Sequence, residues 1–348
     1  MIFDCLLTAD AAWLGGRELA GPTAIGVREG EIGWIGPLPA APDATHREHI
    51  EGVLLPGLID YHVHAALIQP EKLLAAGVTT VMDLGWAPAE IWPLVERARH
   101  DPGLPRIHAA GPFLTAPGGY PSRQPWAPPL VAIEVDDPAA ARRAVEALVA
   151  HRPATIKITL NSQAGPVVDD ATLHAIVRAA DAHGIPVTAH TQGSGQTRRA
   201  QLAGVRVLAH TPWTEILDDR LIADLARDTT IISTIDIHGW GEPSPDREIA
   251  LQNLRRFHSA GGVVRYGTDL GNGPLPLGVN TREIAALTEA GLSPTEVLDA
   301  ITGAPLRPGA PADVSVVPGD PIANPAVLGQ AGAVLKGGQN VTDSDGGG

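Results

Sequence analysis

Residues 53–64 read VLLPGLIDYHVH, an apolar β-type run that closes on two histidines. Seven more runs of this type follow, most of them separated by helix-like stretches, at 79–85, 106–114, 154–160, 186–191, 206–211, 230–236 and 263–269. Near-continuous apolar strands are typical of a parallel sheet that is covered on both faces. Eight such units predict an α/β fold, a closed (β/α)8 (TIM) barrel over residues 56–305. An open doubly wound sheet is the competing fold, but the chain has no glycine-rich phosphate loop of either main type.

Three of the helix-like stretches each open with a pair of aspartates, at 136–137, 169–170 and 218–219. A carboxylate at this position accepts hydrogen bonds from the free N–H groups of the first helical turn. We therefore expect a helix to begin at each pair.

The two ends of the chain differ from the middle. Short β-prone pieces separated by Gly, Pro and Asp fill residues 1–55, and a similar pattern returns within 306–340. Short β-prone pieces separated by turn-forming residues predict hairpins rather than strand–helix units. We expect both ends to form one small β-sandwich domain, and we expect the tail 341–348 to be disordered.

Composition excludes several classes of function. The 348 residues are 44% hydrophobic and 18% charged, as in ordinary soluble proteins, and the net charge of −14 argues against nucleic acid or an anionic membrane as a partner. Cys5 is the only cysteine, so no disulfide forms within the chain. We see no signal-peptide pattern and no apolar run of the roughly 20 residues that a membrane span needs. A cytoplasmic protein is expected, and its oligomeric state, a homo-oligomer included, stays open.

Metal-binding side chains stand at the ends of several of these runs. His62 and His64 are two residues apart on a strand, so both leave the same face and can converge on one ion. His190 and His210 close the fifth and sixth runs in the matching context AHT, and Asp269 closes the eighth. A lone histidine is more often a satisfied core residue and a lone aspartate is readily a helix cap. The set, in order along the chain, indicates a metal centre.

Lys157 lies within the fourth run, in TIKIT. If Ile156 and Ile158 point outward, Lys157 points into the barrel. An unpaired ammonium there costs several kcal/mol, so the lysine should be paired, neutral or modified. A lysine carboxylated by carbon dioxide would be an anionic bridge between two cations. The alternative is a salt bridge to a barrel carboxylate such as Asp60 or Asp83.

These segments resemble the amidohydrolase superfamily in its binuclear, carboxylated-lysine branch. The matching landmarks cover nearly the whole chain in order: PGLIDYHVH, AAGVTTVMDLG, TIKI, TAHT, LAHT, GTDLGN and PGAPADVSVVPGDPIANP. Segment order and the stretch TAPGGY look most like imidazolonepropionase- and prolidase-type members. The resemblance implies a metal-dependent hydrolase that cleaves an amide C–N bond with a metal-bridging hydroxide.

The resemblance also implies the ligand set. Two divalent ions would be held by six side chains, the more buried ion by His62, His64 and Asp269, the other by His190 and His210, and both by carboxylated Lys157. Asp269 would be the catalytic residue that passes a proton to the leaving amine. Zn²⁺ suits these ligands best, and Mn²⁺, Fe²⁺ or Co²⁺ would also fit.

Two departures from the family bear on the substrate. Many relatives read GGH where this chain has Gly118-Gly119-Tyr120, and the short stretch after His64 suggests an open mouth. Deaminases of the superfamily usually carry a glutamate just after the fifth-strand histidine, where this chain has Thr191-Gln192-Gly193. Deamination is therefore only a minor alternative.

Loops after the strand ends should contact the substrate. The candidates are Tyr120, Arg123, Trp213, His238 and Trp240. Tryptophans cluster after strand ends in a chain with only 4% aromatics, which hints at an apolar or aromatic substrate group, although they would also serve to brace loops. Any of the four arginines on this face (Arg123, Arg198, Arg199 and Arg247) could hold a carboxylate in two hydrogen bonds, although solvated surface is the commoner role.

We hypothesise that the substrate is an N-acyl amino acid, a dipeptide or a peptide C-terminus with a hydrophobic side chain. A peptide-maturation amidohydrolase of a biosynthetic pathway is the main variant, and a cyclic-amide hydrolase is a further one. A non-catalytic barrel scaffold is an alternative of another class, but such proteins usually lose ligands, and this chain keeps all six.

Overall fold

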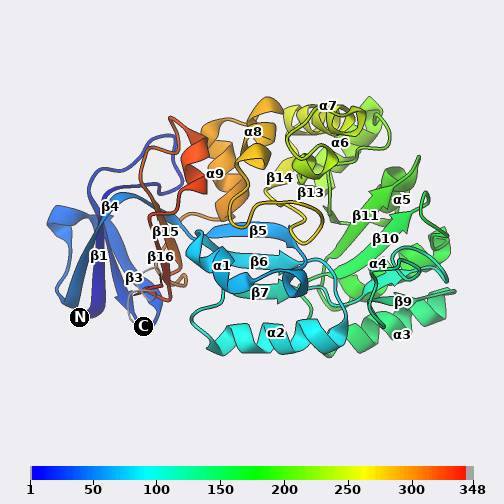
Figure 1. Ribbon diagram of the computed structural model, residues 1–348, viewed down its shortest axis with the longest axis horizontal. Helices are drawn as coiled ribbons and strands as arrows, with labels where there is room; N and C mark the ends of the chain where they lie inside the picture. The colour runs from blue at the N-terminus through cyan, green and yellow to red at the C-terminus, as the bar shows by residue number, and fades with distance from the viewer. Residues whose placement is uncertain (1, 342–348) are drawn as a thin grey trace.

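Strands from both ends of the chain pair in one sheet in the computed structural model, which describes residues 2–341 (Figure 1). We call it the terminal sheet; its strands are β1 (Phe3–Ala12), β2 (Thr23–Arg28), β3 (Glu31–Pro37), β4 (Ala44–Pro56), β15 (Val314–Val317), β16 (Ala333–Lys336) and β17 (Gln339–Asn340). Their order is β17-β16-β15-β4-β1-β2-β3, with β4 parallel to β1 and antiparallel to β15. Leu7, Leu54 and Val316 belong to a separate apolar cluster at this sheet.

All strands of the middle region run parallel to their neighbours. Three form one sheet, namely β5 (Leu58–Val63), β6 (Val78–Asp83) and β7 (Arg106–Ala109). Seven form another, in the order β14 (Val263–Arg265), β13 (Thr230–Ile232), β12 (Val207–Leu208), β11 (Val187–Gln192), β10 (Ile156–Asn161), β8 (Phe113–Thr115) and β9 (Ala132–Glu134). Each of the eight expected runs contains a strand, and β9 is an addition that the sequence did not predict.

Backbone hydrogen bonds connect these two parallel sheets at both margins. The amide of Ala154, just before β10, donates to Ala109 of β7 at 2.9 Å. At the other margin, Tyr61 of β5 donates to Tyr266 at 3.1 Å, and Asp269 donates to His62 of β5 at 2.8 Å. The segment that follows β14 is thereby attached to the first strand of the middle region.

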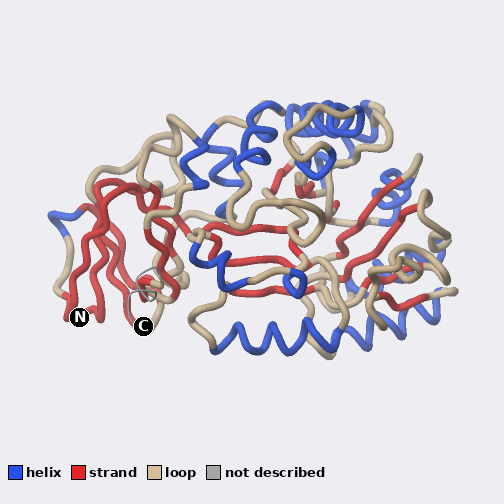
Figure 2. Tube along the Cα trace, in the orientation of Figure 1, coloured by secondary structure: helices blue, strands red, loops and turns tan. Residues whose placement is uncertain are grey.

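Helices lie outside these strands (Figure 2). They are α1 (Pro70–Ala75), α2 (Pro88–His100), α3 (Pro138–Val149), α4 (Asp170–Asp181), α5 (Gln196–Ala203), α6 (Asp219–Asp228), α7 (Pro245–Ser259), α8 (Thr281–Glu289) and α9 (Pro294–Thr302). Short 3-10 turns occupy Leu38–Ala40, Ala65–Leu67, Ile235–His238 and Pro325–Gly329. No helix in the described part of the chain is both long and apolar enough to cross a membrane.

The three predicted helix starts are confirmed. The carboxylate of Asp137 accepts hydrogen bonds from Ala139 and Ala140 at the start of α3. Asp169 and Asp218 play the same part for α4 and α6. In each aspartate pair one carboxylate, that of the first or the second residue, accepts a hydrogen bond from the free N–H groups of the first turn, as its position predicts.

Side chains of β10 alternate as the sequence predicts. Ile156, Ile158 and Leu160 enter the main hydrophobic core. Lys157 points the other way and lines an internal cavity. The expected tail at 341–348 lies outside the described residues except for Val341.

The terminal sheet should depend on the packing of Leu54, which is 1% exposed and pairs with Val316 across β4 and β15. We expect Leu54→Ala to lower the free energy of unfolding by about 2–5 kcal/mol, because it leaves a cavity in the small apolar cluster. Urea unfolding followed by circular dichroism measures the loss. Leu14→Ala, at a side chain that is 37% exposed, is the matched control and should cost much less. Equal losses in the two variants would contradict this account.

Candidate active site

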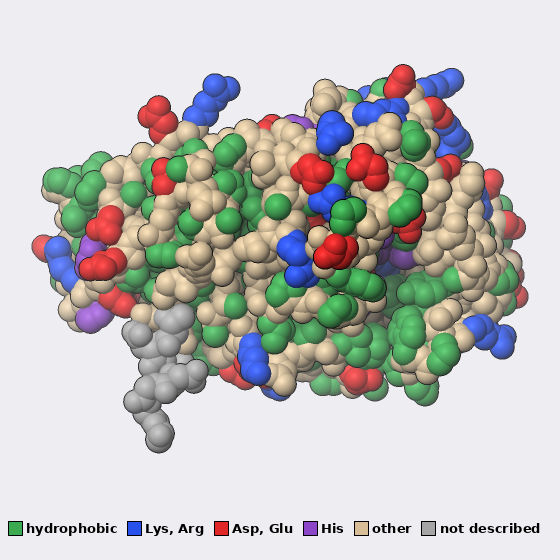
Figure 3. All heavy atoms as spheres, turned by 45° about the horizontal axis from the view of Figure 1, so that its top comes forward, with side chains coloured by type: hydrophobic (Ala, Val, Ile, Leu, Met, Phe, Trp, Pro, Cys, Tyr) green, Lys and Arg blue, Asp and Glu red, His purple; other side chains and the backbone are tan. Residues whose placement is uncertain are grey.

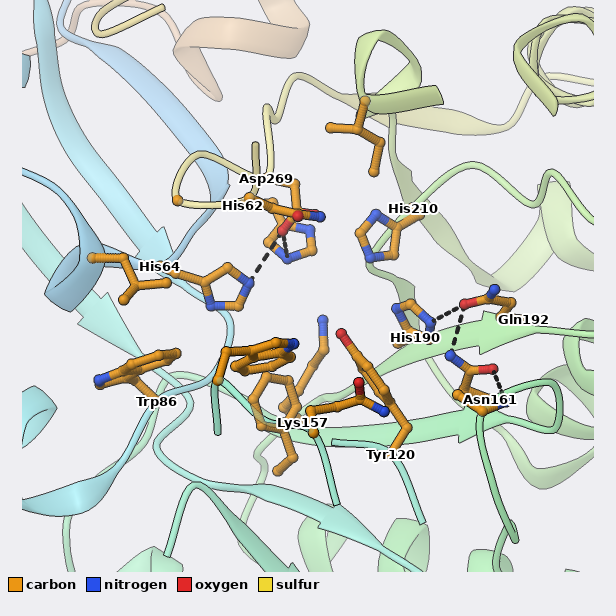
Figure 4. A pocket seen from close by; sticks show the side chains of 18 of the residues that line it. His62, His64, Trp86, Tyr120, Lys157, Asn161, His190, Gln192, His210 and Asp269 are labelled. Carbon is orange, nitrogen blue, oxygen red and sulfur yellow. Dashed lines mark hydrogen bonds and ion pairs between the residues drawn. The ribbon is translucent and has the colours of Figure 1, made fainter. Parts of the chain in front are cut away.

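A cavity of about 610 Å³ opens where several parallel strands end. It brings together nine of the eleven residues predicted from the sequence: His62, His64, Lys157, His190, His210 and Asp269, with Tyr120, Trp213 and His238 (Figure 4). In the space-filling view, histidines are visible at the bottom of this hollow, between hydrophobic side chains (Figure 3). The predicted set is therefore one site in space.

Two backbone carbonyls decide how His62 and His64 present their rings. Nδ1 of His62 lies 2.7 Å from the carbonyl oxygen of Ala209, and Nδ1 of His64 lies 2.9 Å from that of Gly85. A carbonyl oxygen only accepts, so both Nδ1 atoms carry a proton. In the neutral rings each Nε2 then holds a free lone pair. This arrangement is the usual second contact of a metal-binding histidine.

Both lone pairs meet the carboxylate of Asp269. The distances from Nε2 of His62 and His64 to its Oδ1 are 3.0 and 3.1 Å. Oδ1 is buried and has no properly oriented hydrogen bond among residues 2–341, whereas Oδ2 accepts one from Asn272 at 2.8 Å. Three acceptor atoms thus converge in a buried place, and a cation is what such a convergence needs. The residues fit a divalent metal ion.

The protonation states of Asp269 and His62 suit a metal ion. Burial would raise the pKa of Asp269, but His62, His64 and His210 hold it well below its ordinary value. Burial lowers the pKa of His62 to about 4, against the pull of Asp269. For His64, the carboxylates of Asp269 and Asp83 outweigh burial and raise the pKa. At neutral pH, Asp269 is ionised and His62 is a neutral imidazole, which are the ligand forms.

His190 and His210 face the same centre from β11 and from the loop after β12. Nδ1 of His210 bonds to the hydroxyl of Thr234 at 2.9 Å, which leaves its Nε2 for an ion. Nε2 of His190 bonds to the side-chain oxygen of Gln192 at 3.2 Å, which leaves Nδ1. The two ring centroids are 4.9 Å apart. Burial lowers the pKa of His190 to about 3 and that of His210 well below its ordinary value, so both rings are neutral.

A chain of side-chain amides supports His190, and the sequence reasoning missed it. The oxygen of Gln192 also accepts from Asn161 at 2.7 Å, and its nitrogen donates to Gln163 at 3.0 Å. Asn161 follows Lys157 by four residues on β10, and Gln192 follows His190 by two on β11. An even spacing places each on the same face as its ligand. The alternation of side chains along a strand was therefore the signal from which Asn161 and Gln192 could have been predicted.

Lys157 is 1% exposed and has no ion pair or hydrogen bond with the residues drawn around the cavity (Figure 4). Burial lowers its pKa to about 7, against the attraction of Asp269 and Asp83. The carboxylates considered as its partners are engaged elsewhere: Asp60 accepts from the hydroxyl of Thr268 at 2.6 Å, and Asp83 from the amide of Ala65 at 2.7 Å. The amine is thus left without the salt bridge considered above.

The candidate ligands do not all stand at the ends of their strands. Lys157 is the second residue of β10, because β10 and β11 stay paired as far as Asn161 and Gln192. Asp269, in contrast, lies beyond β14, in a loop where its own φ is +59°. The long side chain of Lys157 lines the cavity although its residue lies near the start of β10.

Aromatic rings form the walls above the centre. Trp86 and Trp126 stack with centroids 6.3 Å apart, and Tyr120 meets Trp126 edge-on. Opposite them, Trp213 packs on His238 at 4.6 Å. Burial raises the pKa of Tyr120 to about 12, so its phenol stays a donor. Nε1 of Trp86 and Nε2 of His238 are buried without a hydrogen-bond partner in the described part of the chain.

Two of the predicted substrate contacts lie outside the residues that line this cavity. Arg123 is exposed beside Gly118. Trp240 is 48% exposed and lies over Gly273. Its backbone has a φ of +48°, a conformation that the sequence alone does not reveal.

Comparisons with known proteins agree with this site. A family model described as "Amidohydrolase family" matches residues 53–337. An imidazolonepropionase from Deinococcus radiodurans is 27% identical over 349 aligned residues, which are 84% of this chain and 81% of that protein. A solved structure of a putative prolidase from Bifidobacterium longum has a TM-score of 0.82 at 25% identity, with 98% of this chain and 95% of that chain covered. A Xaa-Pro dipeptidase with bound methionine has a TM-score of 0.81 at 21% identity, with coverages of 97% and 99%.

The buried amine of Lys157 predicts a pH dependence of stability in the metal-free protein. Its folded-state pKa of about 7 is below the ordinary value of 10.5, so the unfolded chain binds more protons between these pH values. Stability should therefore rise with pH across this window. Lys157→Met should flatten the rise, and the exposed Lys72→Met should leave it unchanged. Denaturant unfolding at pH 7 and pH 10 measures both, and an unchanged slope in Lys157→Met would refute the prediction.

Proposed function

We propose, because the chain belongs to the amidohydrolase family, that it hydrolyses an amide C–N bond at a centre for two divalent metal ions. One observation carries the proposal. Nε2 of His62, Nε2 of His64 and Oδ1 of Asp269 converge within 3.1 Å, in the tautomers that bind a metal. His62 and Asp269 also form, with His210, a buried group whose potential ligand atoms all lie within 4.8 Å of one another.

The proposed ligands divide as the family resemblance implies. One ion would be held by His62, His64 and Asp269, the other by His190 and His210, and both by Lys157 after carboxylation. Zn²⁺ suits nitrogen and carboxylate ligands of this kind. When bound, such ions acidify water and polarise a carbonyl oxygen. The lowered pKa of the Lys157 amine and its lack of a salt bridge with Asp60 or Asp83 support its carboxylation, because carbon dioxide reacts with the uncharged form.

Asp269 would move the proton in this reaction. Its ionised carboxylate takes a proton from a water molecule whose oxygen joins the carbonyl carbon of the substrate. The C–N bond then breaks, and Asp269 delivers the proton to the departing nitrogen, so that an acid and an amine leave. The anchoring of Oδ2 by Asn272 supports this role, because it keeps Oδ1 directed at the centre. The phenol of Tyr120 and the ring of His238 would donate to the substrate from the walls.

The aromatic walls support a substrate with a hydrophobic side chain. We retain the class expected from the sequence: an N-acyl amino acid, a dipeptide or a peptide C-terminus. Tyr120, Trp213 and His238 are its proposed contacts. Arg123 and Trp240 leave that set because they lie outside the cavity lining.

We further propose that the two parallel sheets form one closed (β/α)8 barrel over residues 56–305, with 1–55 and 306–340 as a separate β-sandwich domain. The hydrogen bonds from Ala154 to Ala109 and from Asp269 to His62 support closure at the two margins. The separate apolar cluster of the terminal sheet supports the division into two domains.

Metal content tests the centre. After purification in zinc-replete buffer, the protein should hold about two ions per chain, measured by mass spectrometry of the metal. Lys157→Ala should lower the content to about one ion or less and reduce hydrolysis of an N-acyl amino acid and dipeptide library by about 100-fold. Lys72→Ala, at an exposed side chain, is the control. Unchanged metal content and hydrolysis in Lys157→Ala would exclude the carboxylated lysine.

Substitution of Asp269 tests the proton transfer. We expect Asp269→Asn to lower kcat by about 100-fold or more, because an amide cannot take a proton from water. The exposed Asp219→Asn is the charge-matched control. Steady-state kinetics on the same library, with metal content measured in parallel, separates lost chemistry from lost metal. A kcat within about twofold of the unmodified protein would rule out this role.

A further inference from the structure

The cavity walls carry almost no charge. Among the side chains that line it, Lys157 is the only lysine or arginine and Asp269 the only carboxylate, and both belong to the proposed centre. His238, on the wall, is neutral at neutral pH because burial lowers its pKa to about 4. Apart from the histidine and indole rings, the remaining polar lining consists of the phenol of Tyr120 and of four amides, namely Gln124, Asn161, Gln192 and Asn272. The charge inside this site is therefore confined to its floor.

Three of the four arginines that the sequence offered as carboxylate anchors form ion pairs elsewhere. Arg198 forms an ion pair with Asp218. Arg199 pairs with Asp170 at 2.7 Å, and Arg247 pairs with Glu289 at 2.6 Å. None of these arginines, nor Arg123, lines the cavity. A carboxylate next to the scissile bond would find no guanidinium to bind it.

The proposed metal ions do not replace such an anchor. Two divalent ions carry four positive charges, of which Asp269 and carboxylated Lys157 would offset two, and the remainder would act on the attacking water and the scissile carbonyl at the centre rather than at the walls. The chain as a whole carries a net charge of −14, which repels anions rather than attracting them. Transfer of an unpaired carboxylate into an apolar pocket costs several kcal/mol.

The walls instead provide flat apolar faces and neutral donors. Trp126 is half exposed at the mouth and stacks at 6° on Trp86, so one indole face is open to a ligand. The buried N–H of Trp86 and the ring nitrogen of His238 have no partner among residues 2–341. An uncharged group that accepts one hydrogen bond, such as an amide carbonyl, meets these needs. Neutral donors also bind an anion, but they supply no formal positive charge to offset the desolvation of a carboxylate.

We propose that the substrate is uncharged on both sides of the scissile amide and carries an aromatic or bulky apolar group. This inference rests on the proposed function and narrows it. Within N-acyl amino acids, dipeptides and peptide ends, the site selects the forms whose carboxylate is blocked as an amide or continues as a peptide bond. The aromatic wall holds the apolar group, and the neutral amides hold the backbone.

A matched pair of non-hydrolysable ligands tests the proposal in the zinc-loaded protein. The pair consists of ketomethylene analogues of N-benzoyl-phenylalanine, in which CH2 replaces the scissile NH, ending in a carboxylate or in an N-methylamide. Quenching of tryptophan fluorescence reports binding, because Trp86, Trp126 and Trp213 line the cavity. We expect the N-methylamide to bind at least about tenfold more tightly. Equal or tighter binding of the carboxylate would overturn the proposal.

A charge placed on the wall tests the cause of this preference. Gln124→Arg should tighten binding of the carboxylate analogue relative to the N-methylamide by about tenfold, because it supplies the missing guanidinium. Gln330→Arg, at an exposed position outside the cavity, is the matched control. A ratio that stays the same in Gln124→Arg as in the control would show that wall charge does not set the preference.

The cleavable pair, N-benzoyl-phenylalanine and its N-methylamide, is assayed in parallel for release of benzoate. Preferential binding of the neutral analogue without release from either compound would support this inference and remove the proposed hydrolysis. Release of benzoate with a preference for the carboxylate compound would support the proposed hydrolysis and overturn this inference.

Discussion

Two hydrogen bonds to backbone carbonyls fix the chemistry of this centre. Because Ala209 and Gly85 each receive an Nδ1–H, the rings of His62 and His64 direct Nε2 at Asp269. Gly85 follows β6, the neighbour of β5, and Ala209 follows β12, so the order of strands decides how each ring is turned. The convergence of these nitrogens on Asp269 follows from this. The fold would act on the proposed reaction through its main chain as much as through the proposed ligands.

Local periodicity predicted much of this molecule. Alternation along β10 indicated that Lys157 faces inward, and the aspartate pairs marked the starts of three helices, because both signals depend on neighbouring residues only. Loop geometry was not predictable in this way. Trp240 has a backbone with positive φ and lies outside the cavity lining, and β9 pairs beside β8 through a loop whose path depends on distant contacts. The amides of Asn161 and Gln192 lay within reach of the same periodicity, but amides are common and carry no signature of a site.

Charge is distributed differently at the floor and at the mouth of the site. The floor concentrates ionisable groups whose pKa values burial has displaced, as at Lys157 and His190. The mouth is aromatic and amide-lined, and the arginines near it are paired with surface carboxylates. The floor would thus carry the proposed reaction and the mouth would select the substrate. Loops at the mouth could then vary without disturbing the proposed ligands below them.

The pairing of β4 with β15 has a consequence for biosynthesis. Residues 53–56 of β4 pair with residues 314–317 of β15, which are synthesised much later. Almost the entire chain must therefore leave the ribosome before this edge of β4 is paired. Until then the nascent protein presents an open strand edge, which is a template for mispairing with other chains. Expression at low temperature or with chaperones would reduce mispairing at that edge. A chain cut short before residue 314 would keep it exposed permanently.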